Sequence, residues 1–186
     1  MRKHSLTLFV LLVLSIPVHA QKVGVGTNLA DWVNLGTANL EAGLSVGQHF
    51  SVFVGGRFNP WTFYSNRRDE PMHNNVKNAY AGVRFWPWYV YSGWWVGAKG
   101  QYEQFMEGGF WRPILEEGTA VGGGLSGGYT LMIHKNINLE FGVGFWGGRY
   151  TDYTKYQCSG CTDIITAGPR NFIKLDDLVF AIVYVF

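Results

Sequence analysis

Apolar and polar residues alternate with a period of two along much of the chain. The segment INLEFGVGF at 137–145 places Ile, Leu, Phe, Val and Phe on one face, and Asn, Glu and Gly on the other. The segments at 39–46, 50–58 and 79–85 show the same alternation. Successive side chains of a β-strand point to opposite faces, so this pattern predicts strands. We find no convincing helical period.

Eight segments fit this pattern, and their lengths suit strands of about 9–11 residues that cross a bilayer at a tilt. The predicted strands are 22–32, 37–46, 49–60, 78–87, 94–105, 119–133, 137–149 and 173–186. The connections after the second, fourth and sixth strands are short, whereas 61–77, 106–118 and 150–172 are long. The sequence therefore predicts an all-β fold, an eight-stranded antiparallel transmembrane β-barrel with short periplasmic turns and longer outer loops.

The two faces of the predicted strands differ in chemistry. One face carries Val, Leu, Ile and Phe, which is too much apolar surface to leave in water. The other face carries polar residues separated by glycines: Asn28, Glu41, Arg57, Arg84, Lys99, Glu103, Glu140 and Asp177. The interior of an eight-stranded barrel is just wide enough to be filled by side chains. We therefore expect these eight residues to form a polar network in the lumen, with the apolar face toward lipid; a soluble barrel with its polar face outside is the alternative.

Aromatic residues near the predicted strand ends suggest two interfacial girdles. One set surrounds a short turn: Trp86, Trp88, Tyr89, Tyr91, Trp94 and Trp95. The other, at the roots of the long loops, includes Trp61, Trp146 and Tyr150. Such girdles are expected where a barrel meets the two membrane interfaces.

The last nine residues, LVFAIVYVF, form an alternating strand that ends in an aromatic residue. Its outward face holds Leu178, Phe180, Ile182, Tyr184 and Phe186. This arrangement resembles the signal that the outer-membrane barrel assembly machinery reads, so that machinery is a predicted partner. An ordinary buried final strand is the alternative.

The N-terminus has the features of a secretory signal peptide at 1–20. Arg2 and Lys3 precede a short apolar run, and Val18-His19-Ala20 resembles a signal-peptidase site. The chain has 15 Lys and Arg against 13 Asp and Glu, and two of the basic residues belong to this leader, so the remainder carries 13 of each. We therefore expect one barrel domain at 21–186 in the cell outer membrane, in contact with its lipid, and no nucleic-acid binding.

Cys158 and Cys161 are the only cysteines, within YQCSGCTD. Their spacing fits a redox dithiol, half of a zinc site or a small loop disulfide. Export argues against a cytosolic dithiol, and zinc would need further ligands, of which His73 is one candidate. A disulfide across the turn is the preferred interpretation. No metal and no cofactor is predicted.

Three stretches resemble a family of short, uncharacterised outer-membrane proteins of Bacteroidota-type bacteria, similar in fold to the OmpA-like and OmpW-like barrels. They are GTNLADWVNLGTANLEAGL at 26–44, FNPWTF at 58–63 and DYTKYQCSGC at 152–161. The resemblance implies a barrel across nearly all of the mature chain. Members of this family tend to be encoded near fimbrial or other surface-protein genes, which gives no mechanism, and the resemblance supplies no catalytic residues.

Three classes of function remain open. The preferred one is a non-enzymatic barrel that acts as a scaffold or as an accessory subunit of a cell-surface protein complex. A narrow pore or a ligand-binding barrel is the alternative. A lipid-modifying enzyme is disfavoured, because such chemistry needs a nucleophile beside a base. Ser126 has no visible base, and His49, His73 and His134 lie outside the proposed membrane spans.

Overall fold

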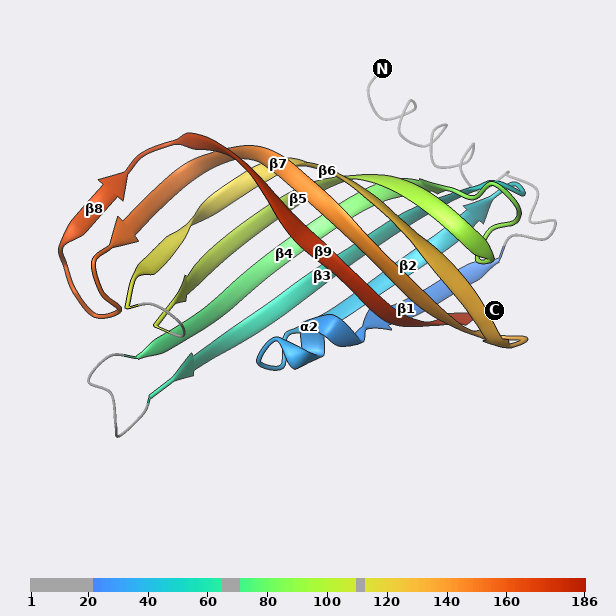
Figure 1. Ribbon diagram of the computed structural model, residues 1–186, viewed down its shortest axis with the longest axis horizontal. Helices are drawn as coiled ribbons and strands as arrows, with labels where there is room; N and C mark the ends of the chain where they lie inside the picture. Colours follow the sequence, from blue (N-terminus) through green and yellow to red (C-terminus); the bar gives the residue numbers. More distant parts are fainter. Residues whose placement is uncertain (1–21, 65–70, 110–112) are drawn as a thin grey trace, which may run out of the picture.

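The computed structural model describes residues 22–64, 71–109 and 113–186. Eight antiparallel strands close into a barrel, and a ninth short strand extends it at one end (Figure 1). The strand order is β6-β5-β4-β3-β2-β1-β9-β7, and pairing of β6 with β7 closes the ring. The predicted eight-stranded antiparallel barrel is therefore confirmed.

The barrel strands differ greatly in length. They are β1 (Val23–Asn28), β2 (Ala38–Val46), β3 (Phe50–Phe63), β4 (Met72–Phe85), β5 (Gly93–Gly108), β6 (Leu115–His134), β7 (Ile137–Tyr156) and β9 (Arg170–Val185). Residues 65–70 and 110–112 of the expected long loops lie outside the described residues. The described parts of 61–77, 106–118 and 150–172 are largely strand, so that part of the prediction is wrong. Antiparallel hairpins continue their backbone pairing beyond the point where the sequence stops alternating, because the pairing needs no apolar face.

The first predicted strand, 22–32, is also wrong beyond Asn28. The chain turns there into a short helix, α2 (Leu29–Val33), which lies about midway between the two ends of the barrel (Figure 1). The side chain of Asn28 accepts a hydrogen bond from the amide of Ala30, as an N-cap residue does. Leu35 and Gly36 have φ angles of 51° and 73°, and this left-handed pair returns the chain to β2.

The short strand β8 (Ile164–Ala167) pairs only with the last residues of β7, Thr154 to Tyr156, among the described strands, and we call the end of the barrel that carries β8 the outer end. All four of its residues are exposed. Figure 1 shows this hairpin at the end of the barrel opposite the C-terminus. The predicted short turns lie at the C-terminal end, around residues 47–49, 86–92 and 135–136.

Apolar side chains cover the outer surface of the barrel. Exposed members include Val52, Val54, Val83, Val96, Leu125, Leu131, Phe141, Val143, Phe145, Leu175, Leu178 and Ile182. The buried side chains on the inner face are in contrast largely polar or aromatic. This inside-out arrangement matches the predicted assignment of the two faces.

No helix among the described residues is long and apolar enough to cross a bilayer.

Both expected aromatic girdles are only partly correct. In the set at the roots of the long loops, Trp61 is exposed but Trp146 and Tyr150 are buried inside the barrel. The set around the short turn is divided in the same way. Trp88, Tyr89 and Trp94 are exposed, but Trp86, Tyr91 and Trp95 point inward and are almost completely buried. They form a core with Val90, Ala181, Val183 and Val185 at the turn-bearing end. Which of these aromatics face outward depends on the path of the turn at 86–92, and the sequence period does not show that path.

Candidate functional site

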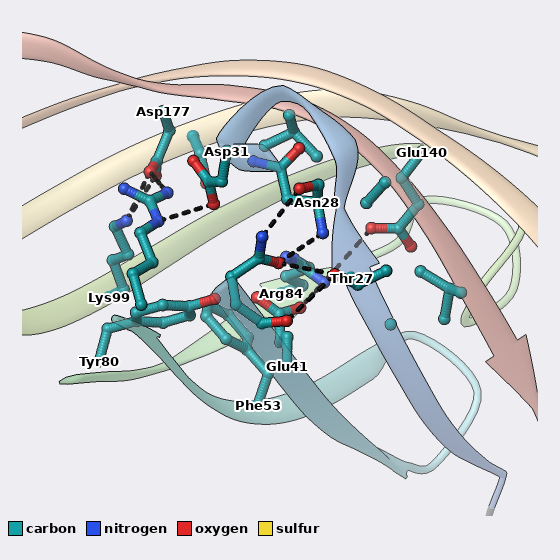
Figure 2. Close-up of a pocket in the computed structure, with 17 residues that line it drawn as sticks. Thr27, Asn28, Asp31, Glu41, Phe53, Tyr80, Arg84, Lys99, Glu140 and Asp177 are labelled. Carbon is teal, nitrogen blue, oxygen red and sulfur yellow. Dashed lines mark hydrogen bonds and ion pairs between the residues drawn. The ribbon is translucent and has the colours of Figure 1, made fainter. Parts of the chain in front are cut away.

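Arg84 of β4 lies in the barrel interior beside two carboxylates (Figure 2). Its Nη1 is 2.7 Å from Oε1 of Glu41 on β2 and 3.6 Å from Oε2 of Glu140 on β7. Its guanidinium carbon is 4.4 Å from the ring centroid of Phe53 and 4.7 Å from that of Trp95. The cation is thus held by charges and by aromatic faces, both of which favour a guanidinium.

A second ion-pair group lies around Asp177 of β9. Lys99 Nζ is 2.6 Å from Asp177 Oδ2, and Arg57 Nη2 is 2.8 Å from Asp177 Oδ1. Arg57 Nε also lies 3.0 Å from Oδ2 of Asp31 on α2. The ring of Tyr80 lies beside both cations, 4.9 Å from Lys99 Nζ and 5.9 Å from the guanidinium carbon of Arg57. Strands β3, β5 and β9 and helix α2 are therefore joined across the lumen.

Glu103 of β5 is the centre of a third polar group, nearer the outer end. Its Oε2 accepts hydrogen bonds from Asn78 at 2.7 Å and from Gln101 at 3.4 Å. Lys174 of β9 donates to its Oε1 at 3.3 Å. Burying an unpaired charge is costly, so these contacts are what allow the carboxylate to remain inside.

Asn28 lines the same cavity but serves a different purpose from the charged residues. Its Oδ1 accepts the backbone N–H of Phe180 at 2.9 Å, and its Nδ2 donates to the carbonyl of Leu178 at 3.0 Å. The side chain therefore continues the hydrogen bonding of β1 along the edge of β9, after the backbone of β1 has turned away into α2.

Little space remains within the lumen. The cavity between the ion-pair groups has a volume of about 40 Å³, which is room for about three water molecules at most. The Trp86, Tyr91 and Trp95 core lies on its turn-bearing side. A second buried cluster lies on its outer side: Ala120, Trp146, Tyr150 and Tyr153, packed with Phe105 and Phe172. The network is thus enclosed between two aromatic layers.

The structure places all eight residues of the expected polar network on the inner side of the wall, and seven of them take part in the three ion-pair groups. Sequence reasoning missed Asp31, because its segment was assigned to a strand. It also missed Lys174, which lies three positions before Asp177 and would therefore fall on the opposite face under strict alternation. A register shift between Gly144 and Phe145 of β7, opposite this part of β9, explains how both face inward.

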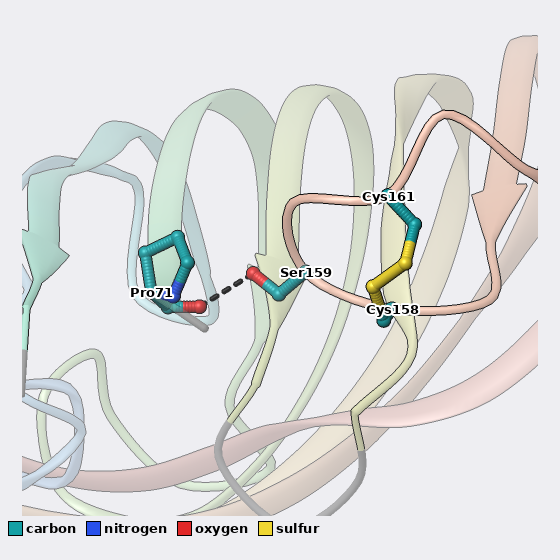
Figure 3. Close-up of a disulfide and its surroundings, with 4 residues drawn as sticks. All are labelled: Pro71, Cys158, Ser159 and Cys161. Atoms are coloured by element: carbon teal, nitrogen blue, oxygen red, sulfur yellow. Dashed lines mark hydrogen bonds between the residues drawn. A yellow bond between two sulfur atoms is a disulfide. The ribbon is translucent and has the colours of Figure 1, made fainter. Parts of the chain in front are cut away.

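The expected disulfide between Cys158 and Cys161 is confirmed (Figure 3). The backbone N–H of Cys161 also donates to the carbonyl of Cys158 at 3.3 Å. Between them, Ser159 is fully buried, and its hydroxyl donates a hydrogen bond to the carbonyl of Pro71 (Figure 3). The disulfide turn is therefore attached to the start of β4.

No group of three or more His, Cys, Asp or Glu that could hold a metal occurs among the described residues. The cysteines are joined to each other, so neither offers a thiolate to zinc. The other candidate ligand, His73, lies with its Nδ1 3.2 Å from the hydroxyl of Thr62.

The residues of the expected assembly signal form an exposed row on the outer face of β9. They are Leu178, Phe180, Ile182, Tyr184 and Phe186. The rings of Tyr184 and Phe186 are in contact, with centroids 4.8 Å apart. The row is accessible along the final strand.

Comparison with known proteins identifies a family but no individual relative. No curated protein and no solved structure matches the chain. One family model matches residues 6–186, which is nearly the whole sequence. The chain belongs to this family, described as proteins of unknown function (DUF3575).

Proposed function

We propose that this protein is a non-enzymatic β-barrel of the outer membrane and that it serves as a scaffold or accessory subunit of a cell-surface complex. The apolar outer face supports the membrane assignment. Residues such as Val54, Leu125 and Leu178 are more than half exposed. In water, this apolar surface would lead barrels to aggregate with one another, whereas lipid tails would solvate it. The eight strands pair around a closed ring, which leaves unpaired strand edges only between β9 and β3 beyond α2 among the described residues.

The arrangement of the lumen carries the proposal of a scaffold. A channel needs a continuous aqueous path, but here ion pairs fill the centre and aromatic layers lie on both sides of them. The carboxylates of Glu41, Glu140 and Asp177 are engaged by Arg84, Lys99 and Arg57, so they are poorly placed to act as bases on a substrate. A rigid, closed barrel suits a structural role better than transport or catalysis.

The outer end supplies a surface for a protein partner. The β7–β8 hairpin extends past the ring, and Ile164 and Ile165 on β8 are more than half exposed. The disulfide turn between these strands is held at its base by the contact of Ser159 with Pro71. Ordered surface loops on a rigid scaffold are common places for binding.

Five measurements test the proposal. The mature protein should begin at Gln21, fractionate with outer membranes and show heat-modifiable gel migration. Single-channel recordings in planar bilayers should show no steady conductance from inserted protein. Affinity purification from crosslinked native membranes should recover a stable surface-protein companion, and an Ile164→Asp, Ile165→Asp variant should recover less of it. A soluble periplasmic monomer obtained without detergent would refute the membrane assignment, and a stable open channel would refute the closed scaffold.

A further inference from the structure

The barrel wall lacks a strand over part of its outer half. β9 pairs with β1 only between Ala181 and Val185, with Asn28 facing Ala181. β2 begins at Ala38, opposite Phe58 of β3. Among the described strands, none pairs with residues 170–180 of β9 on this side, and none pairs with residues 59–63 of β3 on the side facing β9. The ladder is therefore interrupted between β9 and β3.

Helix α2 lies at the inner end of this interruption and presents different chemistry to its two sides. Asp31 points into the lumen, where it meets Arg57. Trp32 is about half exposed, and its indole N–H donates to the hydroxyl of Thr27 at 2.8 Å. Val33 is 85% exposed, which is the largest exposed fraction of any large apolar side chain in the described chain. α2 therefore replaces the wall locally, with a polar inner side and apolar residues beside the gap.

Two separate cavities border this helix. The first is an outer groove of about 400 Å³ formed with β2 and β3; its lining includes Trp32, Ala38, Leu40, Gly56 and Phe58. The second is a vestibule of about 510 Å³ at the outer mouth, lined by Val33, Asn34, Leu35, Met72, His73, Asn74, Glu107, Gly108, Ile114, Glu116 and Lys155. Both volumes fall in the usual range for small-molecule sites. Trp32 lines the outer groove, and the next residue, Val33, lines the vestibule.

We propose that these two cavities form one lateral binding site for a single-chain amphiphile that enters from the outer leaflet. The apolar tail lies in the outer groove, over Gly56 and between Trp32 and Phe58. The polar head passes α2 through the interrupted wall and occupies the vestibule. This inference rests on the proposed membrane location, because a bilayer is what brings such a molecule to the groove.

The vestibule favours a neutral, hydrogen-bonding head group. The ammonium of Lys155 is 2.8 Å from Oε1 of Glu116, so its charge is already balanced. Asn34 supplies an amide group that can donate to and accept from hydroxyls, whereas Asn74 is buried and its Nδ2 already donates to the backbone carbonyl of Asn34 at 3.4 Å. An anionic head would have to compete with Glu116 for Lys155. The ligand class is therefore a monoacylglycerol-like molecule and not a fatty-acid anion.

The test uses folded protein in nanodiscs, analysed by native mass spectrometry with added monolauroylglycerol or lauric acid. The parent should retain one monolauroylglycerol, at least about tenfold more tightly than it retains lauric acid, because the acid must bury its charge. Val33→Glu should weaken monolauroylglycerol binding by at least about tenfold for the same reason. Val33 is so exposed that this change should not impair folding. Ile165→Glu, at an exposed apolar residue on β8, is the matched control and should bind as the parent does.

Flotation of the same preparation with vesicles distinguishes a failure of the lateral binding site from a failure of the proposed membrane location. Protein that does not float would overturn the membrane assignment and the site together. Protein that floats but retains no monolauroylglycerol, or retains it equally well in both variants, would overturn the lateral site alone. Equal retention of lauric acid would overturn the assignment of a neutral head group.

Discussion

The side chain of Asn28 substitutes for a missing piece of strand beside Phe180. Its Oδ1 accepts a hydrogen bond from the backbone N–H of Phe180, and its Nδ2 donates one to the carbonyl of Leu178. The same Oδ1 accepts a hydrogen bond from the backbone N–H of Ala30 and so caps α2. One amide group therefore terminates β1, begins the helix and satisfies the adjacent edge of β9. The interrupted wall depends on this residue for its closure on that side.

Replacing Asn28 with Ala should destabilise the barrel by about 1–3 kcal/mol, because backbone groups of Phe180 and Leu178 lose their partners. Asn28→Asp keeps the acceptor and the cap but loses the donor, so its effect should be smaller. Urea unfolding in lipid vesicles measures both changes. Asn171→Ala, at an exposed position of β9, is the control; equal effects at the two sites would contradict the proposed role of Asn28.

Removing the central guanidinium should have a larger effect. Arg84→Ala leaves Glu41 and Glu140 without their shared cation, and breaking such a buried pair costs about 3–5 kcal/mol. Lys77→Ala, at an exposed position of the same strand, should cost less than about 0.5 kcal/mol. The comparison again uses urea unfolding in vesicles. Similar small values for the two variants would show that water screens the lumen charges.

Deletion of Phe186 should reduce assembly into the outer membrane more than a substitution in β8 does. The deletion removes the end of the exposed aromatic row and its contact with Tyr184. Quantitative immunoblotting of outer-membrane fractions would compare it with Ile165→Ala, at matched expression. If the two variants reach equal levels, the terminal row is not the assembly signal.

The disulfide should shape the outer turn more than it stabilises the barrel. Cys158 and Cys161 are three residues apart, and closing so small a ring contributes at most about 2 kcal/mol. The Cys158→Ser, Cys161→Ser double variant should therefore unfold near the parent denaturant concentration while hydrogen exchange across 157–163 accelerates. Ser159→Ala, which removes the contact with Pro71, should produce part of the same acceleration. Unchanged exchange in the double variant would argue against this role.

Alkaline pH should weaken the turn-bearing end through Tyr91. Burial raises the pKa of Tyr91 to about 12, above the ordinary value of 10.0 that applies in the unfolded chain. The folded state therefore favours the neutral phenol, and this contribution is complete below pH 10.0 and lost as the pH rises through about 12. Unfolding measured across that window should show a smaller decline for Tyr91→Phe than for the parent. Tyr89→Phe, at an exposed residue of the same turn, should decline as the parent does.

The lumen residues could be predicted because strand alternation is a local property. Once 50–58 is known to be a strand, the geometry of the backbone places Arg57 and Ser51 on the face opposite Val52 and Val54. The large apolar area of one face then decides which face points outward. No knowledge of the neighbouring strands is needed for either step.

Other features depend on register and on turns. Trp86 and Trp95 were expected at an interface, yet they fill the lumen, because the turn between β4 and β5 directs them inward. Lys174 could not be placed from alternation, because the irregular pairing of β7 with β9 shifts the face of the chain between Leu175 and Asp177. The sequence pattern did not predict how far the hairpins extend toward the outer end. Their backbone pairing continues beyond the residues in which apolar and polar side chains alternate.

The sequence by itself determined the strand period, the inner and outer faces and the position of the disulfide, since each depends on residues close together in the chain. Only the tertiary structure decided which lumen charges pair. Arg57 and Asp177 lie 120 residues apart, and closure of the ring brings them together. It also decided that the wall is interrupted beside α2. Whether the neighbours of a strand continue past its end depends on how all eight strands pair, which no single segment shows.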